Sequence, residues 1–256
     1  MGRAVVSAGR VLRGCWDQAG RAVDALAFPP TCPVCDASTD GPAFCEDCRV
    51  ELLGASGVAC PRCAMPVGPH ADVAGGCSEC RGRSLGFDRA IALGPYQGPI
   101  RQLCLSLKHE RNAWMARWVA EILAERRSGS LVEEAEARPL IVPVPLHWRK
   151  RLRRGYNQAE ALAVGLGRSL RLEVRPGLRR VVATPKLALA GRTERARLMR
   201  QAFRARGLRG LRGRPILLVD DILTTGATAG AAARALKRAG ASRVVVVVVA
   251  RAEGKP

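Results

Sequence analysis

The sequence predicts an α/β fold, a parallel sheet flanked by helices, preceded by a small cysteine-rich domain. Eight of the ten cysteines fall between residues 32 and 80. From residue 85 onward, short apolar runs alternate with helical patterns, which is typical of parallel sheets whose strands are joined by helices. The hydrophobic fraction of 48% is enough for a buried core and excludes a chain that is disordered throughout.

The N-terminal segment predicts an amphipathic helix over residues 5–28, because apolar residues recur there at helical spacing. The helix is expected to end at Phe28, which precedes two prolines. Arginines and acids throughout this segment exclude the apolar core of a signal peptide. The longest purely apolar run, residues 244–250, is far shorter than the ~20 residues of a membrane span. We therefore expect a cytoplasmic protein with no transmembrane segment.

The clustered cysteines form four pairs, each with two residues between its members. Such a pair holds one ion on a tight turn, and two pairs complete the tetrahedral thiolate shell of Zn²⁺. Disulfides are rare in a reducing compartment, so the pairs are interpreted as metal ligands. We expect two closed, structural zinc sites paired in sequence, with interleaved pairing or an iron–sulfur cluster as alternatives. The ligands are Cys32, Cys35, Cys45 and Cys48 for one ion, and Cys60, Cys63, Cys77 and Cys80 for the other.

The chain divides into three predicted units, residues 1–30, 31–84 and 85–256. In the last unit we expect strands at residues 89–93, 140–144, 173–182, 216–219 and 244–250. Helices are expected at residues 99–127, 155–172 and 230–239, with a polar connector at residues 133–138 and a basic, glycine-dotted stretch at 184–213. Cys15 and Cys104 are expected in the core. The first of these helices has as its expected core contacts Ile100, Leu103, Leu107, Trp114, Trp118 and Ile122.

The stretch from residue 216 to residue 228 is the most informative part of the sequence. An apolar strand runs into Asp220 and Asp221, and an alanine-rich helix follows a loop of small residues. Ligands of open α/β sheets bind beyond the carboxyl ends of strands, and backbone N–H groups at a helix N-terminus bind phosphate. The two carboxylates can accept hydrogen bonds from sugar hydroxyls and position Mg²⁺. The predicted phosphate loop consists of Thr224, Thr225, Gly226, Ala227 and Thr228.

A strongly basic run lies between the strand at residues 140–144 and a helix expected to start near Asn157. A solvated basic loop is one interpretation. The other is a pyrophosphate clamp at the same sheet edge as Asp220, because guanidinium groups bind phosphate oxygens in pairs. The run contains Arg149, Lys150, Arg151, Arg153 and Arg154.

Residues 216–228 closely resemble the phosphoribosyl-pyrophosphate (PRPP) motif of type I phosphoribosyltransferases. Together with residues 28–35, 96–108 and 143–158, they make the whole chain resemble the ComF family. The resemblance implies that Asp220 and Asp221 contact the ribose hydroxyls of Mg²⁺-bound PRPP and that the Thr-Thr-Gly loop holds its 5′-phosphate. Within the basic run it singles out Arg151, Arg154, Asn157 and Gln158. Residues 184–203 occupy the place of the mobile loop that covers PRPP in related transferases.

Three functions follow from these patterns. The first is phosphoribosyl transfer to an unidentified acceptor, in which Asp220, Asp221, Arg151 and Arg154 position and neutralise the reacting groups. The second is PRPP sensing without turnover, because fold does not settle activity. The third is a zinc-ribbon module that binds nucleic acid. The family resemblance implies a link to natural competence, with single-stranded DNA or competence-machinery proteins as partners.

Charge and aromatic content bear on the third function in opposite directions. The net charge of +20 predicts salt-sensitive attraction to polyanions. Nearly all the basic residues are arginine, and Ala, Gly and Arg are abundant, so drift in a GC-rich genome is an alternative origin of this charge. Single-strand binders stack bases on exposed aromatics. Aromatics make up only 4% of this chain, and its four tryptophans fall mostly in apolar helical patterns.

Overall fold

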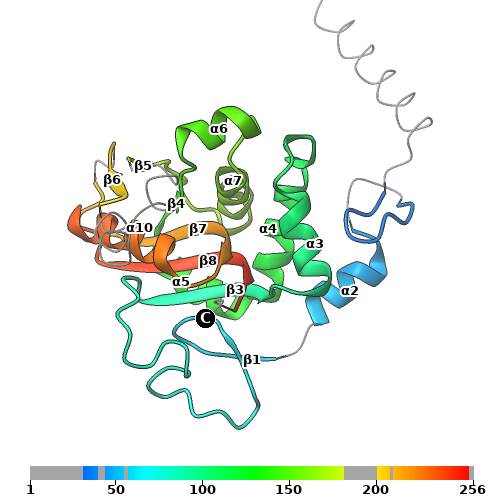
Figure 1. Cartoon of the computed structure of the whole chain (residues 1–256), viewed down its shortest axis with the longest axis horizontal. Helices are drawn as coiled ribbons and strands as arrows, with labels where there is room; N and C mark the ends of the chain where they lie inside the picture. The colour runs from blue at the N-terminus through cyan, green and yellow to red at the C-terminus, as the bar shows by residue number, and fades with distance from the viewer. Residues whose placement is uncertain (1–30, 40–43, 55–56, 182–200, 208–209, 254–256) are drawn as a thin grey trace, which may run out of the picture.

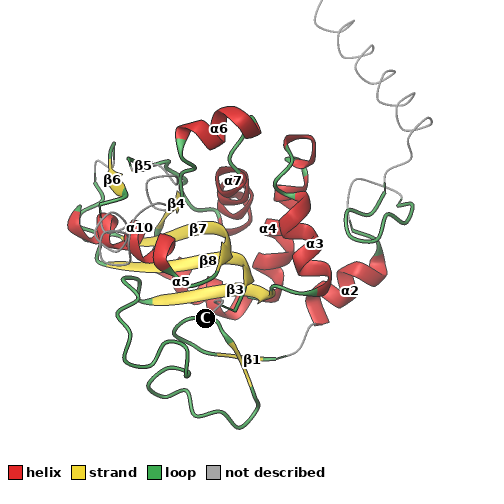
Figure 2. Cartoon of the chain, viewed as in Figure 1, coloured by secondary structure: helices red, strands yellow, loops and turns green. Residues whose placement is uncertain are grey.

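The structure is a computed structural model, and it describes residues 31–39, 44–54, 57–181, 201–207 and 210–253. The expected N-terminal helix with Cys15, and most of residues 184–203, lie outside these ranges. A four-stranded parallel sheet forms the centre of the molecule (Figure 2). Its strands, in spatial order, are β3 (Arg89–Pro95), β8 (Arg243–Arg251), β7 (Pro215–Leu223) and β4 (Leu140–Pro143). The expected α/β class with a parallel sheet is confirmed.

One face of the sheet is covered by helices α3 (Gly98–Ser106), α4 (Met115–Arg126), α5 (Ser128–Glu136) and α7 (Gln158–Leu170) (Figure 1). Side chains alternate between the two faces of a strand, and every second valine of β8 joins the core beneath these helices. Both faces of β8 are buried, so its sequence is a continuous run of valines rather than an alternating pattern. Cys104 is fully buried in this core, as expected.

The other face carries helix α10 (Ala227–Arg238) and a small hairpin of β5 (Leu178–Arg180) and β6 (Phe203–Ala205). Helix α10 is rich in alanine and glycine because the chain packs directly on its backbone. A Cβ added at Gly230 would lie 2.1 Å from the carbonyl oxygen of Leu85, so no larger residue fits there. The second group of four cysteines belongs to the core on this face.

The two halves of the cysteine-rich region pack on opposite faces of the sheet. Helix α2 (Glu46–Gly54) carries Cys48 of the first cysteine group and packs on α3 and α4, where Leu52 is only 1% exposed. The short strands β1 (Val58–Ala59) and β2 (Pro66–Val67) belong to the second part, which runs beneath the edge strand β3 in Figure 1. The two halves of the ribbon region therefore contact different cores.

The single helix expected over residues 99–127 is wrong. The chain forms α3, turns, passes through a short 3₁₀ helix, η1 (Glu110–Asn112), and then forms α4. The turn resets the helical register, so Met115 and Val119 are buried while Trp114 is 43% exposed and Trp118 is half-buried. The connector expected at residues 133–138 is also wrong. Most of it belongs to helix α5, because Glu134 is buried and paired with Arg89 and Arg243.

Other boundaries also differ from expectation. Strand β7 continues through Asp220 and Asp221, because its pairing with β8 extends to Leu223. Helix α10 begins at residue 227 rather than 230, with Gly226 as its N-cap. The basic run is not a loop, since it forms helix α6 (Trp148–Arg154). Of the strand expected at residues 173–182, only residues 178–180 are extended as a strand, in the hairpin outside the main sheet. Within the described residues, no helix is long and apolar enough to cross a bilayer.

Candidate phosphate site and cysteine clusters

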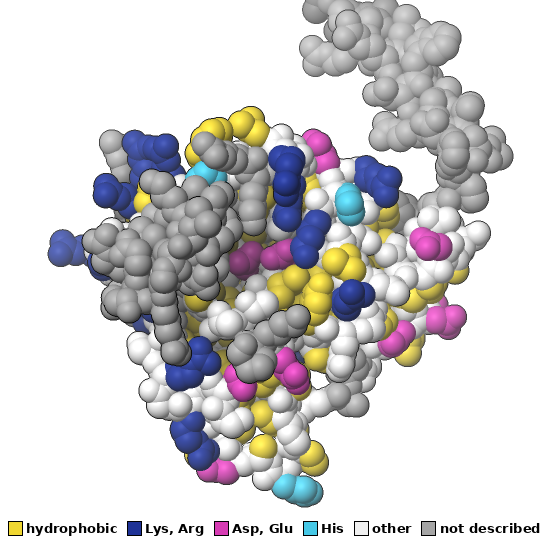
Figure 3. All heavy atoms as spheres, in the orientation of Figure 1, with side chains coloured by type: hydrophobic (Ala, Val, Ile, Leu, Met, Phe, Trp, Pro, Cys, Tyr) yellow, Lys and Arg dark blue, Asp and Glu magenta, His cyan; other side chains and the backbone are white. Residues whose placement is uncertain are grey.

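The carboxyl end of β7 opens into a cavity of about 250 Å³. Acidic side chains lie at the centre of the face shown in Figure 3, with lysine and arginine side chains around them. Three groups line the cavity: two carboxylates, three cations and part of the small-residue loop. They are Asp220 and Asp221; Lys108, Arg154 and Arg180; and Thr224, Gly226 and Thr228. Parallel strands place their carboxyl ends at one edge, which explains why residues so distant in sequence meet here.

The two adjacent carboxylates are held differently. Gln158 Nε2 on α7 donates to Asp221 Oδ2 at 3.0 Å, and the backbone N–H of Ile222 donates to Asp221 Oδ1 at 2.9 Å. Burial raises the pKa of Asp220 well above its ordinary value, and the charge of Asp221 adds to this increase, while Arg180 opposes it. The charge of Asp221 therefore favours the protonated form of Asp220.

The phosphate loop begins helix α10 with an unusual backbone. Gly226 is the N-cap residue and has φ of 77°, a left-handed conformation that other residues adopt only with strain. Thr225 Oγ1 accepts a hydrogen bond from the N–H of Ala227 at 3.4 Å. Of the five predicted loop residues, Thr224, Gly226 and Thr228 line the cavity, whereas Thr225 and Ala227 do not.

Two of the three cations, Lys108 and Arg154, are brought to the cavity by a close contact between two turns that lie far apart in the sequence. Gly155 has φ of 77°, and a Cβ there would lie 2.0 Å from Glu110 Oε2. The left-handed backbone favours glycine at this position, and the Glu110 side chain lies against it. The end of α6 therefore lies against the turn after α3. Arg154 and Lys108, one from each segment, consequently line the same cavity.

Arg151, predicted as the partner of Arg154 in a pyrophosphate clamp, points elsewhere. Its Nη1 donates to Glu160 Oε1 at 2.8 Å, and it does not line the cavity. Residues three apart on a helix share a face, so the helical form of the run does not by itself separate the two arginines. The ion pair with Glu160 on α7 holds the Arg151 guanidinium away from the cavity. Asn157 is the N-cap of α7, and its side chain accepts from the N–H of Ala159 at 3.2 Å.

Sequence reasoning assigned no role to two cavity residues, Lys108 and Arg180. Arg180 comes from the β5–β6 hairpin, which forms between segments that the sequence pattern did not pair. Its guanidinium lies 5.6 Å from the ring of Phe203. Within the described part of the chain, Arg180 Nε and Gln158 Oε1 are buried and lack a hydrogen-bond partner. The signal in the sequence was the pair of arginines at residues 179 and 180, which could be interpreted only with the hairpin known.

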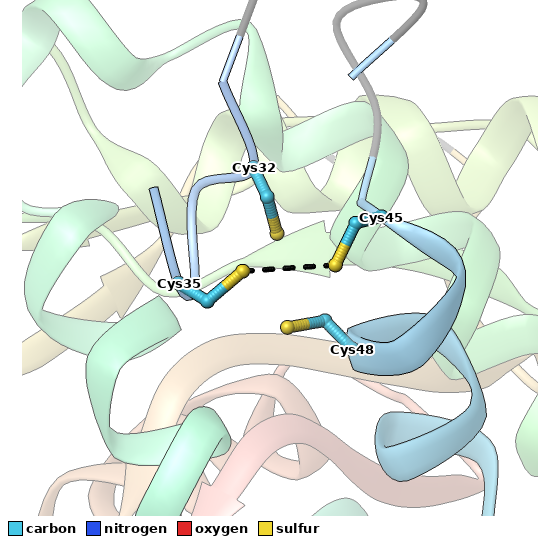
Figure 4. A group of neighbouring side chains, drawn as sticks. All are labelled: Cys32, Cys35, Cys45 and Cys48. Carbon is cyan, nitrogen blue, oxygen red and sulfur yellow. Dashed lines mark hydrogen bonds between the residues drawn. The ribbon is translucent and has the colours of Figure 1, made fainter. Parts of the chain in front are cut away.

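The first four cysteines point their sulfur atoms toward one another (Figure 4). All four Sγ atoms lie within 4.8 Å of each other, and those of Cys35 and Cys45 are 3.6 Å apart. Burial acts to raise the pKa of Cys32, but backbone N–H groups of Cys45, Cys35 and Val34 outweigh it and lower the pKa to about 7. A thiolate held ready by N–H donors is the form that binds metal.

The second four cysteines form a similar cluster, and all of them are buried. The Sγ atoms of Cys63 and Cys77 are 3.5 Å apart, and those of Cys60 and Cys80 are 3.7 Å apart. Four converging sulfur atoms with no place for water fit a closed, tetrahedral zinc site. In both clusters consecutive pairs come together, so the structure contains the sequential grouping and not the interleaved alternative.

Two family profiles match separate parts of the chain. The family profile of the double zinc ribbon domain matches residues 23–81, and that of the phosphoribosyl transferase domain matches residues 160–256. The chain is 30% identical over 230 residues to the DNA utilization protein YhgH of Escherichia coli K12, covering 82% of this chain and 97% of that protein. It is 29% identical over 182 residues to competence protein F of Haemophilus influenzae, covering 69% and 78%. It is 28% identical over 203 residues to competence protein ComFC of Bacillus subtilis, covering 77% and 78%.

Proposed function

The chain belongs to the ComF family of double-zinc-ribbon proteins with a phosphoribosyltransferase domain, and from this premise we propose that it binds PRPP with Mg²⁺ at the end of β7. One observation carries the proposal: two carboxylates, a glycine-capped phosphate loop and three cationic side chains line one cavity. The relatives' names supply its setting, which is the handling of DNA taken up by the cell.

Each part of PRPP has a matching group in the cavity. The 5′-phosphate binds the N–H groups of the loop around Gly226, at the start of α10. Asp220 and Asp221 accept hydrogen bonds from the ribose hydroxyls. We assign the pyrophosphate and its Mg²⁺ to the side that carries Lys108 and Arg154, and we do not place Arg151 there, because it is paired with Glu160.

Transfer and sensing share this binding mode. In a transfer reaction the bond between the anomeric carbon and the pyrophosphate oxygen breaks, and the acceptor forms a new bond to that carbon. The cationic side chains neutralise the departing pyrophosphate, so catalysis is chiefly positioning and charge stabilisation. Release of pyrophosphate in the presence of an acceptor identifies a transferase, whereas binding without release identifies a sensor.

Thermal unfolding with and without PRPP and Mg²⁺ tests the binding proposal. A ligand at 100 times its Kd adds about 2.7 kcal/mol, which raises the midpoint of a chain this size by roughly 5–11 °C. We expect this shift in the wild type and its loss in Asp220→Asn/Asp221→Asn. Arg154→Gln should reduce the shift, and Arg151→Gln, on the same helix, should leave it intact. A folded wild type that shows no shift would exclude PRPP as the ligand.

A second candidate function is supported by a groove beside the cavity. The groove has a volume of about 700 Å³ and lies between α4 and α7. Trp114, 43% exposed, lines it with Trp118 and Tyr156, and the Arg117 guanidinium lies 5.2 Å from the centre of the Trp118 ring. Arg168 adds positive charge. The expectation that these tryptophans belong to the core is therefore wrong, and exposed aromatics with arginines favour single-stranded DNA.

Fluorescence anisotropy of a labelled single-stranded oligonucleotide tests this candidate. Stacking of a base on an aromatic is worth about 1–3 kcal/mol, so Trp114→Ala should weaken binding roughly 5- to 150-fold. Trp148→Ala is the control, because Trp148 is 57% exposed on α6 but does not line the groove. The affinity should fall as salt rises. Equal effects of the two tryptophan substitutions would exclude the groove as the DNA site.

A further inference from the structure

A single buried arginine connects the second cysteine cluster to the phosphate loop. Arg251, at the end of β8, is only 6% exposed. Its Nε donates to the carbonyl oxygen of Cys63 at 3.0 Å. Its Nη1 donates to the carbonyl oxygens of Leu223 at 3.0 Å and Thr224 at 2.6 Å, and also to that of Ala252. One planar cation thus holds a metal-binding turn and the start of the phosphate loop together.

The cost of burying a charge makes this connection rigid. A buried guanidinium is stable only while its donors are satisfied, so the carbonyl groups around Arg251 cannot move away independently. The guanidinium is planar, so it also fixes the angle between the groups that it bonds. The Cys63 carbonyl in turn belongs to a tight turn in which the N–H of Ala64 donates to the carbonyl oxygen of Cys60 at 2.9 Å.

Further contacts join the same two parts. Arg83 Nη2 donates to the carbonyl oxygen of Thr225 at 3.4 Å, and the Arg83 carbonyl accepts from Arg62 at 2.5 Å. Arg62 also donates to the carbonyl oxygen of Cys80 at 2.6 Å. Arg251 and Arg83 therefore bond three consecutive carbonyl groups, that of Leu223 at the end of β7 and those of Thr224 and Thr225 in the loop.

Bonding these carbonyls determines where the loop N–H groups point. In a planar trans peptide the C=O and the N–H point in opposite directions. When the carbonyl oxygens of Leu223, Thr224 and Thr225 face the second cluster, the N–H groups of the following residues face away from it. Those N–H groups belong to residues 224–226, the start of the loop assigned to the 5′-phosphate.

We propose that Arg251 is a positioning residue that couples the second metal site to the phosphate loop, so that zinc and PRPP bind cooperatively. The inference rests on the proposed function, PRPP binding at this loop. Without the metal, the turn at Cys60–Ala64 loses its anchor, and the Cys63 carbonyl no longer fixes Arg251 or the loop carbonyls. Coupling between two sites is reciprocal, so PRPP must also strengthen zinc binding at the second site.

The first site provides an internal control. Its ribbon is bonded to the rest of the chain by Arg126, whose Nη1 donates to the carbonyl oxygen of Leu52 at 2.8 Å. This bond lies on the face of the sheet that α3 and α4 cover, whereas the phosphate loop leads into α10 on the other face. Zinc at the first site should therefore be indifferent to PRPP.

Equilibrium competition for zinc with a chromogenic chelator measures the reciprocal effect in the unaltered chain. With saturating PRPP and Mg²⁺, compared with Mg²⁺ alone, we expect one zinc ion to bind at least about 5-fold more tightly and the other with unchanged affinity. Cys48→Ala, which removes a ligand of the first site, should retain the ion that PRPP protects. A PRPP-induced thermal shift with unchanged affinity for both ions would overturn the coupling and leave the proposed function intact. The absence of any thermal shift would overturn both.

Two matched substitutions test the role of Arg251 directly. Arg251→Lys retains the charge but cannot reach both sets of carbonyls. It should keep two zinc ions per chain, bind PRPP roughly 10-fold more weakly and lose the protection of zinc by PRPP. Arg126→Lys makes the same change at the first ribbon and should behave as wild type in PRPP affinity and zinc protection. Wild-type PRPP affinity and wild-type protection in Arg251→Lys would overturn the proposal, and the zinc-competition measurement on the wild type stands if this variant fails to fold.

Discussion

The two cysteine clusters have nearly the same local geometry and very different surroundings. In each, the residue after the second cysteine has a left-handed backbone, with φ of 60° at Asp36 and 57° at Ala64. In each, that residue donates to the carbonyl oxygen of the first cysteine at 2.9 Å. However, Cys35 of the first cluster is exposed, whereas the whole second cluster is buried in the core that contains α10.

The comparison teaches that a metal motif acquires its role from what packs around it. The first ribbon ends on α3 and α4, where its main anchor is Leu52. The second shares a core with β7, β8 and α10, and the phosphate loop connects β7 to α10. Loss of metal binding at the first cluster should therefore have only local effects, whereas loss at the second cluster should also alter the phosphate loop.

The largest difference is expected for loss of one ligand from each cluster. Cys63→Ala should lower the free energy of unfolding by at least about 4 kcal/mol, because structural zinc contributes folding energy and this site lies in the shared core. That is a fall of roughly 8–16 °C in the thermal midpoint. Cys48→Ala, a similarly buried ligand of the first site, should produce less than half of this effect. Equal losses, measured by calorimetry with zinc content, would contradict the distinction between the sites.

A cavity at the anchor of the first ribbon should separate stability from binding. Leu52→Ala removes a fully buried side chain and should cost about 3 kcal/mol, a fall of roughly 6–12 °C. The remaining folded protein should bind PRPP with the wild-type Kd, because Leu52 packs in the core beneath α3 and α4, on the face of the sheet opposite α10. Calorimetric titration of PRPP into this variant checks the prediction. A weakened PRPP affinity would show that the first ribbon also supports the loop.

A pH titration tests the role of Asp220, which lies in β7 beside the loop. The pKa of Asp220 is raised in the folded chain, so between its ordinary pKa of 3.8 and the raised pKa the folded state binds more protons than the unfolded state. Folding stability therefore decreases as pH rises through this window. Asp220→Asn should raise the thermal midpoint at pH 7 by roughly 2–4 °C, the effect of about 1 kcal/mol, while weakening PRPP binding.

The same carboxylate should make PRPP binding depend on pH. The ionised form accepts hydrogen bonds from both ribose hydroxyls, so PRPP affinity should increase as pH rises through the raised pKa of Asp220. The stability gained by Asp220→Asn should shrink as pH falls toward 3.8. A gain that is constant from pH 7 to pH 4 would show that ionisation of Asp220 is not its source.

The smallest effect is expected at the surface of the first ribbon. Arg49 Nη2 lies 2.7 Å from Glu125 Oε1, and both side chains are about half exposed. Arg49→Ala should change the free energy of unfolding by no more than about 0.5 kcal/mol, and the change should vanish in high salt. Thermal unfolding at low and high salt measures it. A shift above roughly 3 °C would mean that this ion pair anchors the ribbon after all.

The sequence predicted most of the sheet and much of the candidate site for identifiable reasons. Paired cysteines and the valine run of β8 are local signals that packing did not change. The acids at residues 220 and 221 lie where a ligand site was expected. The helix break after Leu107, the helix at residues 148–154 and the cavity roles of Lys108 and Arg180 were not predictable, since each depends on contacts between distant segments.

The sequence by itself determined the parallel α/β fold, the four cysteine pairs and the strand, loop and helix around Asp220, because short-range periodicity and spacing encode them. Only the tertiary structure decided how the cysteine pairs combine, which cations face the carboxylates and which cysteine group lies against the loop. Arg154 faces the cavity and Arg151 does not, because the Arg151 guanidinium is paired with Glu160 on α7. Arg251 joins the loop to one ribbon only, since β8 ends where those two segments meet. Such contacts between distant residues depend on burial and on strand register, and no local sequence pattern predicts them.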